Sequence, residues 1–560
     1  MAMLPCQEDV LLYTKLLVRI ESIVGTSGEK EIAETLHALL AALPYFQQNP
    51  SYLVKSPTLN DEIERYNVMA FVKGTKRPSG RTVILMGHLD TVGTDDYGAL
   101  KSSACEPDGL RRELMRQELP DDLRRQLESG DWLFGRGALD MKSGLASHLY
   151  LLQYYSERPE ELAGNIVFVA ECDEEDGSHG ILSAIRQLLA WQEEHGFDYI
   201  AAINADFVSP RYPGDPNRYI YKGTVGKLLP AFYITGAETH AGACFEGLDP
   251  NWLAAELTRE LNYNPELCNA AHGEVGAPPV TLKQTDLKPS YDVQTGLAAY
   301  VYYNMLIYTW TPKEALSRLK RHAEIAFGRA LALYAERYRA YCRMSGEPER
   351  DIPWRPRVLT YDEMNRMLLS EHGDRYGQHM ERFKRELLLD RTLDLRMYSL
   401  KVVEEAWRWM KDRSPAMVLF FASLYSPRVE LSGSNDKELR LIEALDEAVR
   451  SVQDRYEHPI RIKPFFPYIS DMSFVGISDD DESIAAEAAN NPSWNSKLLV
   501  DYEAIRRLDV PVINIGPYGM DAHKKHERAE IRYSMFIVPN ITHRVVQRLL
   551  TPIGEQAGEG

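Results

Sequence analysis

Hydrophobic and polar positions follow two different periods in the first 200 residues of the chain. Apolar residues recur at helical spacing in one set of segments, 12–20, 29–43, 142–154 and 179–195. A second set is short and almost wholly apolar, at 66–72, 82–86, 165–170 and 199–204. Such runs are typical of strands that are buried in a sheet. Alternation of the two sets predicts an α/β layer with parallel strands, whose active site is expected beyond the carboxyl ends of the strands.

The pattern changes near residue 219. Strands are predicted at 228–235 and 297–310, helices at 250–261 and 313–342, a Pro-rich and charged break at 346–357, and further helix to about 413. Apolar strands then return at 417–422 and 511–515. The simplest arrangement is an α/β domain formed by residues 1–218 and 416–560, interrupted by an inserted domain at 219–415. A charged stretch at 97–130 is predicted to be a helical surface insertion without a chemical role.

Composition narrows the class of protein. The 560 residues are 44% hydrophobic and 26% charged, as in a soluble globular protein, and the net charge of −18 argues against a general nucleic-acid binder. No apolar run approaches the length of a membrane span, and the N-terminus lacks the pattern of a secretory signal. The six cysteines show no CxxC pairing, which favours reduced thiols. These observations predict a cytoplasmic enzyme.

Candidate chemistry gathers at the ends of the predicted strands. Each residue alone has an ordinary structural interpretation; Asp140, for example, precedes a predicted helix and would serve as its N-cap. Consecutive carboxylates such as Asp173, Glu174 and Glu175 repel one another unless a cation lies among them. Two imidazoles and three carboxylates in one location suit a pair of divalent cations such as Zn²⁺, with one carboxylate bridging. That set is His88, Asp140, Glu175, Asp206 and His523.

Several motifs appear in a fixed order, namely HLDTV, GRGALDMKSGLA, DEEDGSHG, THAG and a late AH…E. In this order they resemble the metallopeptidase family M20, which includes aminoacylases, carboxypeptidase-G and succinyl-diaminopimelate desuccinylase. The resemblance spans about 10–260 and 415–550 and is greatest to the arginine-utilisation branch. It implies a zinc-peptidase catalytic domain of phosphorylase/hydrolase-like α/β fold with a parallel-rich sheet, and an inserted α+β domain that acts as a lid and in dimerisation.

The resemblance also implies a set of metal ligands. Asp140 would bridge two divalent ions, His88 and Asp206 would hold one of them, and Glu175 and His523 would hold the other. Zn²⁺ is the expected metal, with Mn²⁺ or Co²⁺ as alternatives.

Further roles follow from the same resemblance. Asp90 would orient His88, Glu174 would be the general base, and His240 in the inserted domain would stabilise the oxyanion of the tetrahedral intermediate. The peptide bond that follows Asp140 is expected to be cis. Many relatives carry an arginine that binds the substrate carboxylate, and Thr309 stands at the corresponding position here, so this contact is expected to differ.

The resemblance implies hydrolysis of an amide bond in a small peptide or an N-acyl amino acid. Its arginine branch suggests amino-acid catabolism, with an arginine-related compound as a candidate substrate. Two alternatives remain open: a binding or regulatory protein that keeps the fold without hydrolysis, and a hydrolase of carbamoyl or ureido C–N bonds. Neither a nucleic acid nor a membrane is an expected partner. The inserted domain leads us to expect a homodimer or a pseudo-dimeric single chain.

Overall fold

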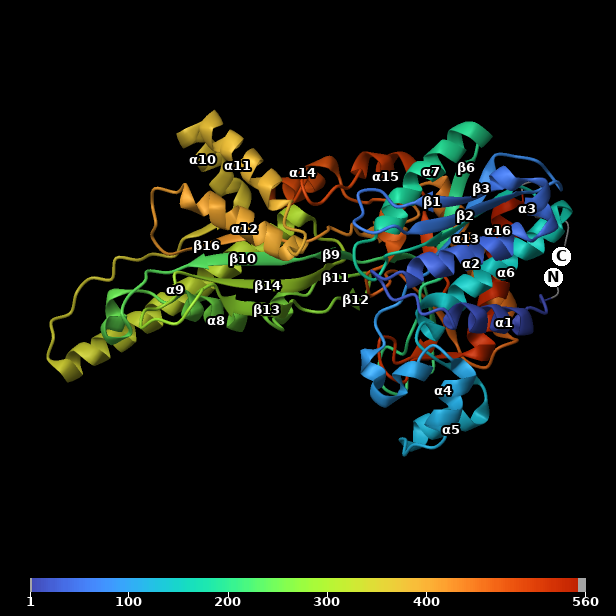
Figure 1. The fold of residues 1–560 in the computed structure, drawn as a ribbon, viewed down its shortest axis with the longest axis horizontal. Coiled ribbons are helices and arrows are strands. Elements are labelled where there is room, and N and C mark those ends of the chain that lie inside the picture. The colour runs from blue at the N-terminus through green and yellow to red at the C-terminus, as the bar shows by residue number, and fades with distance from the viewer. Residues whose placement is uncertain (1–2, 552–560) are drawn as a thin grey trace. The chain divides into compact units, whose positions relative to one another are not determined.

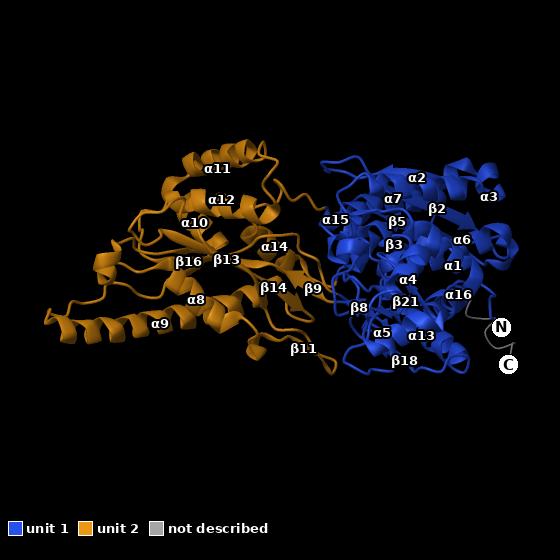
Figure 2. Ribbon diagram, turned by 60° about the horizontal axis from the view of Figure 1, so that its bottom comes forward, with its two compact units in different colours: residues 1–224, 429–477, 501–560 blue, residues 225–428, 478–500 orange. Residues whose placement is uncertain are grey.

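The structure, a computed structural model, describes residues 3–551 and divides into two compact units (Figure 2). Unit 1 comprises Met1–Thr224, Val429–Ile477 and Asp501–Gly560. Unit 2 comprises Val225–Arg428 and Ser478–Val500. Two segments that the sequence assigns to the α/β domain, 416–428 and 478–500, therefore belong to unit 2.

The strand predicted at 417–422 accounts for the first of these differences. Strand β16 (Ala416–Phe421) lies between β10 (Pro230–Thr235) and β15 (Val358–Thr360), in the sheet of unit 2. All six of its residues are buried. A wholly apolar strand is compatible with the centre of either sheet. The apolar run therefore predicts that the strand is buried but does not predict which strands lie beside it.

Unit 1 is built on a mixed sheet of eight strands. Strand β3 pairs in parallel with both β5 and β6, and β6 pairs in parallel with β19, whereas β2 pairs with β5 in the antiparallel sense. The strand order is β1 (Leu53–Pro57), β2 (Tyr66–Lys73), β5 (Asn165–Glu171), β3 (Arg81–His88), β6 (Asp198–Asn204), β19 (Val512–Asn514), β7 (Arg218–Tyr221) and β18 (Ile460–Lys463). The α/β layer with a parallel centre is confirmed.

Helices pack against this sheet (Figure 1). Helices α6 and α16 contact β3, while α2 and α7 contact β2. The helix predicted at 179–195 has the observed bounds of α7. The principal helices of unit 1 are α1 (Gln7–Val18), α2 (Gly28–Ala41), α6 (Ser143–Glu157), α7 (His179–His195), α13 (Asp436–Gln453), α15 (Tyr502–Leu508) and α16 (Val538–Leu550).

The charged insertion has a small core of its own. It contains a 3-10 segment, Asp95–Ser103, and the helices α4 (Pro107–Leu114) and α5 (Asp121–Ser129). Its apolar side chains cluster beneath these helices, including Leu110, Leu114, Leu123 and Leu127. The insertion leads into β4 (Trp132–Phe134), which forms a three-stranded sheet with β20 (Gly519–Met520) and β21 (Arg528–Glu530). The predicted helices of the insertion are thus confirmed.

Unit 2 contains a second sheet, in the order β13 (Val280–Asp286), β14 (Ala298–Ile307), β10, β16 and β15, with β9 (Gly226–Leu228) paired to β14. Helix α8 (Pro250–Leu261) contacts β13 and β14, and α9 (Pro312–Ser345) contacts β15 and β16. The remaining principal helices are α10 (Tyr361–His372), α11 (Asp374–Leu387), α12 (Leu395–Arg408) and α14 (Asp481–Asn490).

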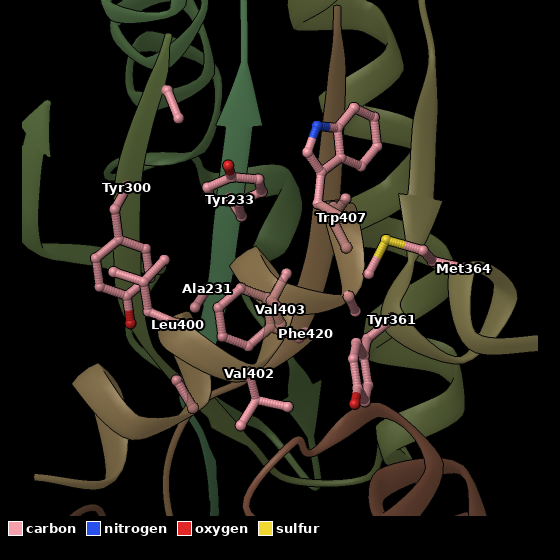
Figure 3. Packing of buried hydrophobic residues seen from close by; sticks show 14 of the residues in the cluster. Ala231, Tyr233, Tyr300, Tyr361, Met364, Leu400, Val402, Val403, Trp407 and Phe420 are labelled. Carbon is pink, nitrogen blue, oxygen red and sulfur yellow. The ribbon is translucent and has the colours of Figure 1, made fainter. Parts of the chain in front are cut away.

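The core of unit 2 lies between its sheet and helices α10 to α12 (Figure 3). Tyr300 of β14 stacks on Phe420 of β16, with ring centroids 6.2 Å apart, and Tyr233 of β10 meets Trp407 of α12 edge to face. Successive side chains of a strand point to opposite faces. Phe232, next to Tyr233, accordingly packs edge to face on Tyr303, whose hydroxyl lies 3.2 Å from Thr258 of α8. The sheet is therefore covered on both faces.

All six cysteines are free, as predicted. Within residues 3–551, no helix combines the length and the apolar character that crossing a bilayer demands.

The buried imidazole of His148, on α6, is expected to make the stability of unit 1 depend on pH. Burial lowers its pKa to about 3, so it is neutral in the folded protein and takes up a proton on unfolding below pH 6.5. Its contribution to stability is complete above pH 6.5 and is lost as the pH falls from there toward 3. Between pH 6.5 and 5.0 the loss amounts to about 2 kcal/mol.

Urea unfolding at pH 7.5 and pH 5.0 measures this effect. His148→Gln is expected to reduce the difference between the two pH values by about that amount, whereas His458→Gln, at a more exposed position, is expected to leave it unchanged. An identical pH dependence in His148→Gln and the wild type would contradict the assignment.

Candidate metal centre

Four of the predicted site residues of unit 1 lie at the ends of strands that meet at one edge of its sheet. His88 is the last residue of β3, Glu174 and Glu175 follow β5, and Asp206 follows β6. Because β3, β5 and β6 are parallel neighbours, their carboxyl ends lie together. His523 comes after β19, the next strand of the sheet.

Asp140, at the start of the segment that leads into α6, lies between two imidazoles. Its Oδ1 is 3.1 Å from Nε2 of His88, and its Oδ2 is 2.8 Å from Nε2 of His523. The same His523 nitrogen is 3.1 Å from Oε1 of Glu175. One ligand atom from each of His88, Asp140 and Glu175 falls within 4.8 Å of the others. These three residues form a candidate metal site.

Asp90 connects the imidazole of His88 to the loop that carries the two glutamates. Nδ1 of His88 is 3.1 Å from the main-chain oxygen of Asp90 and 3.6 Å from its carboxylate. That carboxylate accepts hydrogen bonds from the backbone N–H groups of Glu174, at 3.2 Å, and Glu175, at 3.0 Å. Asp90 thus holds the His88 ring through its main-chain oxygen and the backbone of the acidic loop through its buried carboxylate.

The other two predicted carboxylates lie beside this group. Oε2 of Glu174 is 3.9 Å from Nε2 of His88. Asp206 is buried, and its backbone N–H donates to the side-chain oxygen of Asn514 on β19 at 2.9 Å. After burial, the charge of Asp140 is the largest cause of a raised pKa at Asp206. Asp206 is therefore close enough to interact electrostatically with the cluster.

Electrostatics in this region favour a cation. Burial raises the pKa of Glu174 well above its usual value, and the negative charges of Asp206 and Glu175 push it in the same direction against His88. Hydrogen bonds to Asp140 and Glu175 raise the pKa of His523 to about 10. Carboxylates that raise one another's pKa are stabilised as anions when a cation binds among them.

The backbone at Asp140 is held by residues that the sequence analysis did not single out. The Asp140–Met141 peptide bond is cis, as expected from the resemblance. The buried carboxylate of Glu527 accepts hydrogen bonds from the N–H groups of Leu139, at 3.1 Å, and Asp140, at 3.2 Å, and pairs with Arg136 at 2.6 Å. Arg136 lies in the motif GRGALDM and Glu527 in the motif AH…E. Their position within these motifs was the sequence feature that could have identified them as part of the site.

Comparison with known proteins identifies the family of this chain. The family model described as "Peptidase family M20/M25/M40" matches residues 84–486. The chain is 36% identical to protein RocB of Bacillus subtilis over 543 residues, which cover 97% of this chain and 95% of RocB. The chain belongs to peptidase family M20/M25/M40.

A second relative and a solved structure are also similar to this chain. The chain is 33% identical over 557 residues to the uncharacterized protein YqjN of B. subtilis, with 99% of this chain and 98% of YqjN covered. Its fold resembles that of an M20 family metallo-carboxypeptidase from Sulfolobus solfataricus, with a TM-score of 0.51, 12% identity, and coverage of 97% of this chain and 99% of that chain. The protein is a hydrolase of the M20 peptidase family.

Two predicted residues lie in unit 2. His240 is exposed, and its Nδ1 accepts a hydrogen bond from the backbone N–H of Gly242 at 3.0 Å. Thr309 lies in the turn before α9, where its hydroxyl accepts from the side-chain amide of Asn269 at 3.0 Å. The side-chain oxygen of Asn269 accepts from three backbone N–H groups of this turn, at 2.6, 2.7 and 3.0 Å. Thr309 is thus part of a turn that the side chain of Asn269 holds through hydrogen bonds.

Two further buried carboxyls near the cluster escaped the sequence analysis. Glu171 ends β5 and lies opposite His88 in the register of β3 and β5. After burial, the charge of Asp471 is the first cause that raises the pKa of Glu171, and it also raises the pKa of Glu174. Glu171 adjoins a quoted motif, whereas Asp471 follows no predicted strand and carries no sequence signal.

A buried ion network anchors the start of the acidic loop. The guanidinium of Arg65 pairs with Asp173 at 2.9 Å, Glu29 at 2.7 Å and Asp61 at 2.6 Å. Glu29 also accepts the backbone N–H of Asp173 at 2.9 Å. Asp173 immediately precedes Glu174, so this network fixes the start of the loop that bears both glutamates.

Replacement of Arg65 by methionine is expected to destabilise unit 1 by about 3–5 kcal/mol, because it leaves Glu29 and Asp173 buried without their cation. Denaturant unfolding of the purified variant measures the change. Arg125→Met is the matched control, since Arg125 is 71% exposed and pairs only at the surface of the insertion. Equal unfolding midpoints for Arg65→Met and Arg125→Met would rule out a stabilising role for the network.

Proposed function

We propose that the protein hydrolyses an amide bond in a small peptide or an N-acyl amino acid, with two divalent cations and Glu174 as general base. The observation that carries the proposal is the carboxylate of Asp140 between the imidazoles of His88 and His523. A carboxylate with a different imidazole beside each oxygen is suited to bridge two ions, because each oxygen has a second donor next to it.

The donor set fits such a pair of ions. Asp140 would bridge them, His88 and Asp206 would complete the protein ligands of one, and Glu175 and His523 those of the other. Imidazole and carboxylate donors favour Zn²⁺, with Mn²⁺ and Co²⁺ as alternatives. The orientation of His88 by Asp90 suits a metal ligand, because a hydrogen bond at Nδ1 leaves Nε2 available for the ion. When bound, the two ions would supply Lewis-acid chemistry, lowering the pKa of a water molecule and polarising the substrate carbonyl.

Glu174 is suited to moving the proton. Its carboxylate lies next to His88 without belonging to the proposed ligands, and its backbone is held by Asp90. A carboxylate in this position is suited to take a proton from the attacking water and to deliver it later to the leaving amine.

For His240 we propose stabilisation of the oxyanion. Because Nδ1 accepts the N–H of Gly242, the neutral ring carries its proton on Nε2. That N–H belongs to an exposed side chain and is free to donate to a developing negative charge.

The proposed setting is cytoplasmic amino-acid catabolism, including that of arginine-related compounds, which agrees with six free thiols. We further propose a homodimer, with a pseudo-dimeric single chain as the alternative. Strand β13, at the edge of the sheet in unit 2, is half exposed and supports an assembly through this unit. Light scattering of the purified protein distinguishes the two.

A substrate screen tests the proposed activity. Protein loaded with Zn²⁺ is expected to release amine from dipeptides or N-acyl amino acids, and treatment with a chelator is expected to abolish the release until metal is restored. Ureido acids are assayed separately, because hydrolysis of these alone would replace the proposal with carbamoyl C–N bond cleavage. Absence of turnover in all three classes, with metal bound, would contradict an amidohydrolase.

A further inference from the structure

A pocket of about 560 Å³ lies within unit 2, at the C-terminal end of α9. Its walls come from the short helix Ala241–Glu246, from α9 and from the segment 347–354 that follows α9 in the chain. The volume is within the range of small-molecule sites. None of its residues is among the proposed metal ligands, so the pocket is a separate feature of the molecule.

Aromatic rings line the pocket. Tyr334, Tyr338 and Tyr341 are spaced four and three residues apart, which puts them on one face of α9. The ring of Phe245 lies against all three, with centroid distances of 5.6, 5.3 and 5.2 Å. Trp354 meets Tyr334 edge to face at 5.4 Å. Five aromatic side chains from three segments thus converge on one cavity.

The hydroxyl of Tyr334 has no hydrogen-bond partner among the residues that the structure describes. Its side chain is buried, with 4% exposure, and burial raises its pKa to about 12, so the hydroxyl is neutral. The neighbouring Tyr338 differs, because its hydroxyl accepts the backbone N–H of Arg350 at 3.1 Å. An unpartnered buried hydroxyl costs free energy unless a ligand supplies the missing bond.

The charges of the lining residues favour a cation. The lining carries three carboxylates, those of Glu246, Glu347 and Asp351, and one guanidinium, that of Arg350. Aromatic faces attract organic cations through their quadrupole, and nearby carboxylates add to this attraction. A ligand with a carboxylate as its only charge would meet repulsion from three groups.

We propose that this pocket binds a small organic cation with an alkyl chain that ends in an ammonium or guanidinium group. The chain would lie against the rings of Phe245 and Tyr341, and the cationic head would face the carboxylates of Glu347 and Asp351.

The pocket shares a wall with the segment that orients His240. Gly242 lines the cavity and donates its N–H to the His240 ring. A bound ligand would therefore restrain the backbone next to His240. Binding itself requires no residue of unit 1, so it is measurable whether or not the chain hydrolyses the proposed substrates.

Calorimetric titration of the full-length protein with n-butylammonium, 1-butanol and butyrate tests the proposal. The cation is expected to bind saturably and at least about five-fold more tightly than the alcohol of the same length, and butyrate more weakly than either. Tyr341→Ala, at an exposed ring, and the double variant Glu347→Gln with Asp351→Asn are each expected to weaken binding of the cation about three-fold or more. Tyr291→Ala, whose ring is 91% exposed and outside the pocket, is the matched control.

Alkylation of the exposed thiol of Cys244, which lines the pocket, provides a readout specific to the site. The rate of modification by N-ethylmaleimide, followed by peptide mass spectrometry, is expected to fall in butylammonium and to stay unchanged in butyrate. Equal affinity for butylammonium and 1-butanol, or binding that survives in both pocket variants, would overturn the proposal.

Discussion

Replacement of Glu174 by alanine is expected to lower kcat by about 10²–10⁴-fold and to leave the metal content of the purified protein unchanged. The carboxylate lies 3.9 Å from the His88 nitrogen, beside the proposed ligands and not among them. The loop should keep its conformation in the variant, because Asp90 holds it through backbone N–H groups that the substitution retains. Elemental analysis and steady-state kinetics on the substrate found in the screen measure the two quantities.

Asp176→Ala is the matched control for this variant. Asp176 belongs to the same acidic loop and is exposed, so its removal is expected to change kcat by less than about two-fold. Wild-type turnover in Glu174→Ala would exclude Glu174 as the base, and a coincident loss of metal would assign it to the ligands instead.

Replacement of Asp140 by asparagine is expected to weaken metal binding at least about 100-fold and to abolish turnover. Both carboxylate oxygens are used, one facing His88 and the other His523, whereas an amide offers a single neutral oxygen. Titration of metal-free protein with Zn²⁺ measures the affinity and the number of ions bound.

Asp131→Asn provides the control for the loss of one negative charge, since Asp131 is exposed and lies apart from the cluster. It is expected to bind Zn²⁺ as the wild type does. If Asp140→Asn binds the same number of ions with the same affinity, a bridging role for Asp140 is untenable.

Sequence periodicity predicted the positions of single helices and strands better than it predicted which strands pair. The bounds of α7 and α8 are those expected, because each helix has one apolar face. The strand at 417–422 also exists, yet its partners β10 and β15 belong to unit 2. A local run of apolar residues predicts burial. Strand pairing depends on segments far away in the sequence, which the local run does not determine.

The candidate site was predictable where residues follow strands and fall within motifs. Of the three residues that form the candidate metal site, His88 and Glu175 have both properties, whereas Asp140 falls within a motif and precedes a helix. Arg65 and Asp471 have neither property. Each interacts electrostatically with a residue far away in the sequence, Arg65 with Asp173 and Asp471 with Glu174. Their contribution depends on the tertiary structure, which brings Arg65 to Asp173 across 108 positions of the chain.

The sheet order of unit 1 has a consequence for biosynthesis. Strand β19 pairs with β6, although some 300 residues separate them in the chain, and all of unit 2 is synthesised in between. While the ribosome makes those residues, the hydrogen-bonding edge of β6 that β19 will cover has no native partner and is open to non-native pairing. His523 emerges later still, so the imidazole-flanked carboxylate of Asp140 is completed only after most of the polypeptide has left the ribosome, and a nascent chain stalled before that point would lack the full set of metal donors.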